Sequence, residues 1–431
     1  MSNGQGNDYR HNHYVPEWYQ RRFLLPNQTA YHYLDLKPDV ITNSSVTFTK
    51  KDLHIWGPRK CFAQDDLYTV NWGSIRNRDI ERFFFGRLDT EAPSAVEYFA
   101  SYKRFSVHGE AFHTLMRYMS TQKLRTPKGL GYLRTLSSVK DQNLTLILLQ
   151  RIQDMYVAIW SECIWQIADA SQSPTKFIIS DHPVIAYNRA CYPMSDWCNG
   201  FNDPEVTRVA THTYFPLSID KLLILTNLSW VRDPYQSETN VRPNPNLFRP
   251  AMFNFQDIQM NRVLTEEEVV EINFVTKQRA LHYIAAAEKD WLYPERHLRD
   301  DHWRKLGDGY LFMPDPRHIY MGGETFIGYK DGTSEGFGAY GHRPGQPGYQ
   351  DQQREERERN ALERFKAEWS VTHGTKYRAT SGQFYHPGDK IRSDESADMH
   401  KHYIDHDEKY RNREGERQRR RSLRRKKPES A

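Results

Sequence analysis

Cysteine is scarce in this chain, and its spacing excludes the common zinc and redox motifs. Four cysteines are present, and none belongs to a CxxC pair. Cys191 and Cys198 are seven residues apart, which is not a typical spacing for zinc ligands. In a cytosolic protein we expect these two, together with Cys61 and Cys163, to be reduced thiols in or near the core.

Long hydrophobic runs and most catalytic signatures are also absent. No apolar stretch approaches the roughly 20 residues that a membrane-spanning helix needs. The first residues lack the basic start and apolar core of a secretory signal. The chain contains no phosphate-binding glycine loop, no HExxH and no GxSxG. We therefore predict a cytoplasmic protein with no membrane segment, whose reaction no standard motif reveals.

The net charge of +5 is concentrated near the C-terminus. Residues 343–431 contain 22 Lys and Arg against 16 Asp and Glu, so this part carries +6 and the remainder carries −1. Apolar residues become sparse from Ser370 onward, a composition typical of disorder. The block from Arg417 to Lys427 holds eight basic residues. It could bind nucleic acid through charge alone, or it could be a solvated extension.

Hydrophobic periodicity predicts an α+β fold. Period-two alternation predicts a small antiparallel β region within 30–70 and a second one that includes a hairpin of 213–218 with 221–228. Between them, apolar residues three and four apart predict a central helical block. We expect one α+β domain over 1–295, a Gly/Pro/aromatic-rich extension over 296–369 with a charged helix, and a disordered basic tail over 370–431.

Several helix boundaries follow from capping and proline signals. A helix is predicted over 109–124, and Pro93 predicts a junction between two helices. Asp141 can cap a long helix that runs to about Ala170. Thr265 and Glu268 form a capping box at the start of a helix that reaches about Glu288.

The stretch 11–23 contains two histidines, several large aromatics and two arginines beside a proline. His13 could act as a general base, and Arg21 suits carboxylate or phosphate binding. Alternatively, the segment is a rigid piece docked on the core, with His13 satisfied by a backbone carbonyl.

A second polar stretch, Ser180-Asp181-His182-Pro183, follows an apolar strand. Strand ends hold polar groups rigidly, so Asp181 could bind a metal, orient a histidine or act as a base, with Ser180 beside it. The alternative is an Asx or Ser turn that ends the strand.

Two acids and an arginine complete the candidate set. Glu81 and Glu91 lie on a stretch rich in aromatic residues. Each carboxylate must therefore be exposed to solvent, paired with a cation or functional. Arg125 could pair with one of these acids, or it could be a cation favoured by the helix C-terminus.

These motifs together resemble a large, mostly bacterial family of proteins that is classed only as a domain of unknown function. Residues 13–23 are similar to its HYVPxxYxRxF opening, and Arg125-Thr126-Pro127 is similar to its RTP element. Residues 177–183 resemble its FITSDNP motif, with His182 where that family usually has Asn. The resemblance covers residues 11–292 and implies no known reaction, but it favours one shared polar site.

The leading hypothesis from the sequence is a hydrolase, specifically a metal-dependent nuclease or phosphodiesterase. Asp181 and Glu81 would bind Mg²⁺ or Mn²⁺, His13 would activate water, and Arg21 and Arg125 would hold a phosphate. Two alternatives stay open. One is a non-catalytic module that binds nucleic acid through the basic tail, and the other is a protein that binds an anionic metabolite without turnover.

Overall fold

A computed structural model gives the structure of this protein, and it confirms the α+β class. Contacts within the chain divide it into two units. The first comprises Met1–Pro314 and Met321–Leu362, and the second comprises Asp315–Tyr320 and Glu363–Ala431. The structure describes residues 11–374, except for 44–45, 73–74, 78–83, 104–108, 199, 244, 249–257, 320, 322–324, 329–330 and 339–341.

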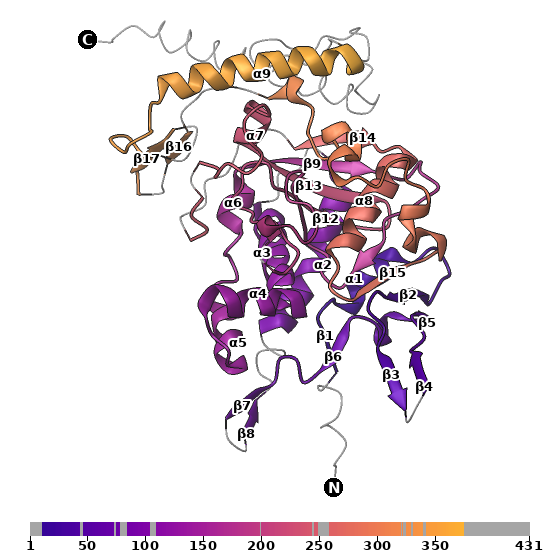
Figure 1. Cartoon of the computed structure of the whole chain (residues 1–431). Helices are drawn as coiled ribbons and strands as arrows, with labels where there is room; N and C mark the ends of the chain where they lie inside the picture. The colour runs from indigo at the N-terminus through magenta and orange to yellow at the C-terminus, as the bar shows by residue number, and fades with distance from the viewer. Residues whose placement is uncertain are drawn as a thin grey trace, which may run out of the picture. The chain divides into compact units, whose positions relative to one another are not determined.

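The first unit contains a four-stranded antiparallel sheet that joins distant parts of the sequence. Its strand order is β10 (Ile179–Ser180), β15 (Tyr283–Ala286), β2 (Tyr31–Asp35) and β5 (Leu53–Trp56). Ile284 of β15 lies opposite Ser180 of β10 on one side and opposite Leu34 of β2 on the other. The sheet therefore joins β2 and β5, from the predicted N-terminal β region, to β10 and β15 from much later in the chain (Figure 1).

A five-stranded sheet forms the other half of this core. Its order is β11 (Ile185–Tyr187), β12 (His212–Pro216), β13 (Lys221–Asn227), β9 (Cys163–Asp169) and β14 (Gln259–Val263). The predicted hairpin is confirmed as β12 and β13, and only β14 pairs in parallel with its neighbour. β9 is an interior strand between β13 and β14, and nearly all its residues are buried.

The helical block precedes β9 in the chain. In Figure 1 most of it lies to the left of β2, β5 and β15. The helix expected over 109–124 is confirmed as α3. Thr126 caps α4, Asp141 caps α5 and Thr265 forms the predicted capping box of α8. The α-helices of the described residues are α1 Glu17–Gln20, α2 Gly86–Ala100, α3 Gly109–Arg125, α4 Pro127–Ser137, α5 Gln142–Arg151, α6 Val157–Ser161, α7 Leu228–Arg232, α8 Glu266–Arg279 and α9 Gln352–His373.

Three predicted helix boundaries are wrong. The helix from Asp141 ends at Arg151, and residues 163–169 form β9 instead, because a continuous apolar run suits a fully covered strand as well as a helix. The helix α8 ends at Arg279, since residues 283–286 find a pairing partner in β2. Pro93 lies inside α2, where the buried residues on either side of it keep the helix packed on the core.

The opening stretch docks on the five-stranded sheet through aromatic contacts. The Tyr19 ring stacks on Phe215 at a centroid distance of 5.1 Å, and its hydroxyl donates to the Pro216 carbonyl at 2.6 Å. Phe23 packs edge-on against Tyr19, and both side chains are fully buried. The N-terminal segment is therefore an integral part of the core rather than a loose arm.

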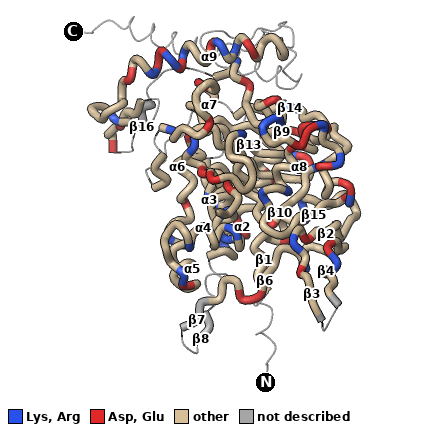
Figure 2. Tube along the Cα trace, viewed as in Figure 1, with Lys and Arg blue, Asp and Glu red and all other residues tan. Residues whose placement is uncertain are grey.

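The remaining elements are short hairpins, 3₁₀ turns and the charged helix. Acidic and basic residues are interspersed along α9, the charged helix predicted within residues 296–369 (Figure 2). Most of the predicted tail, from residue 375 onward, lies outside the described residues. The two-stranded pairs are β1 His11–His13 with β6 Ala63–Asp65, β3 Val40–Asn43 with β4 Val46–Thr49, β7 Val70–Trp72 with β8 Ile75–Asn77, and β16 Thr325–Gly328 with β17 Ser334–Phe337.

In the part of the chain that the structure describes, no helix combines the length and the apolar character required to cross a bilayer. All four cysteines are buried free thiols, as predicted.

Candidate functional site

His13 and Arg21 make local contacts in the structure. The His13 Nε2 atom lies 3.1 Å from the Arg59 carbonyl oxygen, and burial lowers the pKa of the imidazole. Arg21 is exposed and donates to Glu17 one helical turn earlier, at 2.7 Å. These contacts match the docked-segment interpretation of the opening stretch.

Arg125 is fully buried and held by an acid that the sequence did not single out. Its two terminal nitrogens each donate to one carboxylate oxygen of Asp89 at 3.0 Å, and its Nε donates to Gln122 at 2.8 Å. Burial by itself would lower the pKa of the guanidinium, but the charge of Asp89 raises it above its usual value. Glu91 instead pairs with Arg87 at the surface, and Glu81 lies outside the described residues.

Asp181 is an internal anchor for the backbone between α8 and β15. Its carboxylate accepts N–H groups from Leu281 at 2.9 Å, His282 at 2.6 Å and Tyr283 at 2.9 Å. Burial raises the pKa of Asp181, although these three hydrogen bonds oppose the rise. The Ser180 hydroxyl accepts the His182 N–H at 3.2 Å, which is the Ser turn that the sequence left open.

The described residues include no group of three or more His, Cys, Asp and Glu side chains arranged to hold a metal ion. Of the predicted Mg²⁺ or Mn²⁺ ligands, Asp181 already directs its oxygens at backbone N–H groups, and Glu81 is not described. The metal-dependent mechanism stays a prediction.

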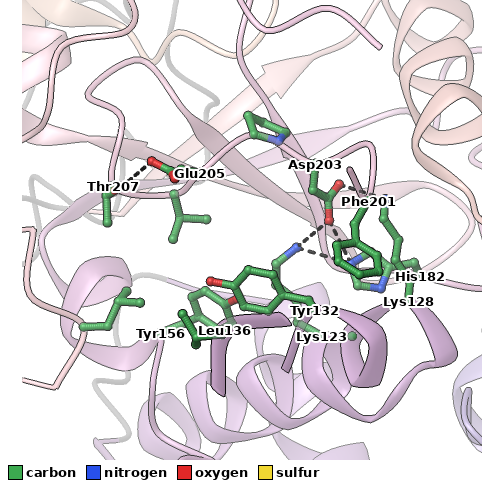
Figure 3. Close-up of a pocket in the computed structure, with 14 residues that line it drawn as sticks. Lys123, Lys128, Tyr132, Leu136, Tyr156, His182, Phe201, Asp203, Glu205 and Thr207 are labelled. Carbon is green, nitrogen blue, oxygen red and sulfur yellow. Dashed lines mark hydrogen bonds and ion pairs between the residues drawn. The ribbon is translucent and has the colours of Figure 1, made fainter. Parts of the chain in front are cut away.

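Three of the sequence motifs nevertheless come together. The Thr126 hydroxyl lies 2.7 Å from His182 Nδ1, which joins the RTP-like element to the strand-end motif. Gln122 Nε2 donates to the Tyr14 carbonyl at 2.8 Å, which brings in the opening stretch. Their meeting point lies next to a cavity of about 230 Å³ (Figure 3).

Two lysines from adjacent helices converge on one carboxylate in this cavity. Lys123 Nζ lies 3.3 Å from one oxygen of Asp203, and Lys128 Nζ lies 3.0 Å from the other. His182 Nε2 lies 3.2 Å from the same oxygen that Lys123 contacts. Figure 3 shows Asp203 at the centre of these three side chains.

A sharp corner between α3 and α4 places the lysines. Thr126 stands between the helices, and its hydroxyl accepts the Gly129 N–H at 3.1 Å, while Pro127 supplies the fixed φ of a first helical residue. A Cβ at Gly129 would lie 2.1 Å from the Lys123 carbonyl oxygen, so only glycine permits this corner. Lys123 in the last turn of α3 and Lys128 in the first turn of α4 therefore face the same cavity.

The loop that carries Asp203 is fixed from the opposite side. Asn202 adopts a positive φ of 56°, and its side chain donates to the Gln278 carbonyl at 2.6 Å. Arg279 donates to the Asn202 carbonyl at 2.8 Å, and the Arg279 carbonyl accepts Lys128 Nζ at 2.7 Å. The end of α8 thus holds both Asp203 and its lysine partner.

Burial shapes the protonation of the cluster. Burial raises the pKa of Asp203, but Lys123 and Lys128 overcome this effect and hold it well below its usual value. Burial lowers the pKa of Lys128, and it lowers the pKa of His182 to about 3 with a further contribution from Lys123. At neutral pH the cluster therefore contains a carboxylate and an uncharged imidazole.

The depressed pKa of His182 predicts a loss of stability in mild acid. The unfolded chain binds a proton near pH 6.5, but the folded chain does so only near pH 3, so stability falls as pH falls through this window. Between pH 7 and pH 5 the contribution of His182 to this loss is expected to be about 2 kcal/mol. Urea unfolding at both pH values measures it.

The matched variant for this test is His182→Gln, compared with His113→Gln at an exposed position of α3. Glu271, whose pKa burial raises to about 7, acts in the opposite sense, but its effect cancels in the difference between variant and wild type. The difference should change by about 2 kcal/mol between the two pH values for His182→Gln and stay constant for His113→Gln. A constant difference for His182→Gln would contradict the assignment.

Sequence reasoning missed Lys123, Lys128 and Asp203. The two lysines flank the Arg125-Thr126-Pro127 element, so that motif correctly indicated the α3–α4 corner where the site lies. Asp203 lies in a loop without a distinctive pattern. Comparisons with protein-family models, with curated proteins and with solved structures found no match for this chain.

Proposed function

We propose that the cavity at the α3–α4 corner binds a small anionic molecule. The observation that carries the proposal is the excess of positive charge: two lysine ammonium groups share the single carboxylate of Asp203. Their side chains are only 7% and 2% exposed. An uncompensated buried cation costs several kcal/mol, and a bound anion would offset that cost.

The other charges around the cavity are balanced. Glu205, which also lines it, is paired with Arg208 at 3.3 Å. Arg279 and Asp181 both interact electrostatically with Lys128, with opposite signs. The local excess of one positive charge therefore belongs to the Lys123–Lys128–Asp203 cluster.

Nucleophilic catalysis has less support from this geometry. Thr126, His182 and Asp203 form a hydroxyl–imidazole–carboxylate chain with separations of 2.7 and 3.2 Å. However, the Thr126 hydroxyl also caps α4, and the residue is fully buried and does not line the cavity. A substrate in the cavity would not reach it. The nucleic-acid alternative depends on Arg417 to Lys427, which lie outside the described residues.

Lys123→Met tests the proposal directly. Thermal unfolding of the full chain would be followed with increasing acetate, benzoate and inorganic phosphate, because a ligand that binds only the folded state raises its stability. We expect at least one of these anions to stabilise the wild type, with an affinity about tenfold lower in Lys123→Met.

Lys176→Met is the matched control, since the Lys176 ammonium donates to the carbonyls of Ala170 and Ser171 and does not line the cavity. It should respond to anions like the wild type. Equal stabilisation of the wild type and Lys123→Met by every anion would show that binding occurs elsewhere.

A further inference from the structure

Apolar side chains line much of the same cavity, which restricts the ligand beyond its charge. Side chains from α4 and from the segments around residues 201 and 247 form this apolar wall. Tyr132 lies between the charged cluster and Leu136, so the two kinds of surface are adjacent (Figure 3). The apolar wall is lined by Tyr132, Leu136, Phe201, Pro204, Val206 and Leu247.

Phe201 has a fixed place in this wall. A Cβ at Gly131 would lie 2.7 Å from the Phe201 ring, so the absence of a side chain at Gly131 lets the ring rest directly on α4. Phe201 and Asp203 belong to the same short loop. The loop therefore presents an apolar ring and a carboxylate to the cavity two residues apart.

The volume of the cavity limits the size of the ligand. Apolar cavities of roughly 150 Å³ hold one benzene molecule, whereas drug-sized ligands occupy roughly 300–1,000 Å³. At about 230 Å³ this cavity has room for one ring with a short substituent. It is too small to enclose a nucleotide.

The charge of the cluster limits the ligand further. One excess positive charge is neutralised by a monoanion, whereas a phosphate monoester dianion would leave an excess negative charge next to Asp203. Lys123 is the cation through which such a monoanion would be held. Its contacts with His182, the Val184 carbonyl and Asp203 are 3.2–3.3 Å long, whereas Lys128 donates to two protein oxygens at 3.0 Å or less.

We propose that the ligand is a small monocarboxylic acid whose body is a single aromatic ring or a short branched chain. This inference rests on the proposed function, because it assigns the carboxylate to the lysine end and the apolar body to the wall that Tyr132, Leu136 and Phe201 form. Burial of the body adds affinity, and the charge adds affinity and also sets the orientation of the ligand.

Calorimetric titration of the full chain at pH 8 tests this with four probes: phenylacetate, acetate, phenyl phosphate and the uncharged phenylacetamide. We expect phenylacetate to bind about tenfold or more tightly than each of the others, since burying some 60 Å² of apolar surface accounts for a factor of this size over acetate.

The outcomes separate this inference from the proposed function. If acetate or phenyl phosphate binds as tightly as phenylacetate, in a Lys123-dependent way, the monocarboxylic acid assignment is overturned while anion binding stands. If phenylacetamide binds equally well, or if no probe binds, both the assignment and the proposed anion site are overturned.

Leu136→Gln adds a structural control, because Leu136 on α4 and Leu144 on α5 are each 51% exposed and only Leu136 lines the cavity. Phenylacetate should bind about threefold or more weakly to Leu136→Gln and unchanged to Leu144→Gln. Acetate should bind both variants like the wild type. Equal phenylacetate affinity in the two variants would contradict the placement of the apolar body.

Discussion

Replacing Asp89 with alanine is expected to lower the free energy of unfolding by about 3–5 kcal/mol. The guanidinium of Arg125 is 1% exposed, and Asp89 is the only acid among its hydrogen-bond partners in the described part of the chain. Without Asp89, a full positive charge would remain buried against the rings of Phe85 and Tyr118. Urea-induced unfolding at pH 7 measures the change.

Glu91→Ala supplies the control on the same helix. Glu91 lies two residues after Asp89, but its partner Arg87 is 79% exposed, so its loss should change stability by less than about 1 kcal/mol. Similar losses of stability in Asp89→Ala and Glu91→Ala would show that the buried Arg125–Asp89 pair stabilises the fold no more than the exposed Arg87–Glu91 pair.

A double variant distinguishes the pair from its parts. Asp89→Ala combined with Arg125→Met removes both charges, and a buried ion pair replaced by apolar side chains is often close to neutral. We expect the double variant to recover about 2 kcal/mol or more relative to Asp89→Ala. Strict additivity of the two single changes would contradict direct coupling between the two side chains.

Asp181→Ala is the second substitution with a large expected cost, about 3–5 kcal/mol in the free energy of unfolding. The change would leave the N–H groups of Leu281, His282 and Tyr283 without their acceptor, at about 1–3 kcal/mol for each group that finds no other partner. These N–H groups lead into β15, which pairs with both β10 and β2. The cost would therefore reach the centre of the four-stranded sheet.

Asp181→Asn should lower the free energy of unfolding by less, about 1–3 kcal/mol. The amide keeps one acceptor oxygen, but its NH₂ group would face a backbone N–H, and both are donors. Burial raises the pKa of Asp181, so loss of the negative charge is not in itself the expensive step. Asp35→Ala is the control: Asp35 ends β2 and its side chain accepts the N–H of Lys37 in an exposed turn. It should cost less than about 1 kcal/mol.

The measurement is again the free energy of unfolding, taken for all three variants. Unchanged stability in Asp181→Ala would contradict the interpretation of Asp181 as a backbone anchor. The reactive carboxylate that the sequence suggested would then be the favoured role.

Local sequence signals determined the elements that depend on neighbouring residues. The periodicity of α3, the caps at Asp141 and Thr265, and the β12–β13 hairpin could all be read from the chain, because the side chains that form each signal are close in sequence. The same reasoning failed for β9 and β15. Their apolar runs fit a helix or a strand, and the choice depended on pairing partners more than 50 residues away.

The candidate site shows the same division. The sequence by itself determined two motifs, Arg125-Thr126-Pro127 and the Ser180–Pro183 stretch, and these do meet at the Thr126–His182 hydrogen bond. Only the tertiary structure decided that Lys123 and Lys128 are buried and share Asp203. A lysine near a helix end is ordinarily solvated. Its loss of contact with water depends on every segment packed around it, and no pattern in one stretch of sequence records that.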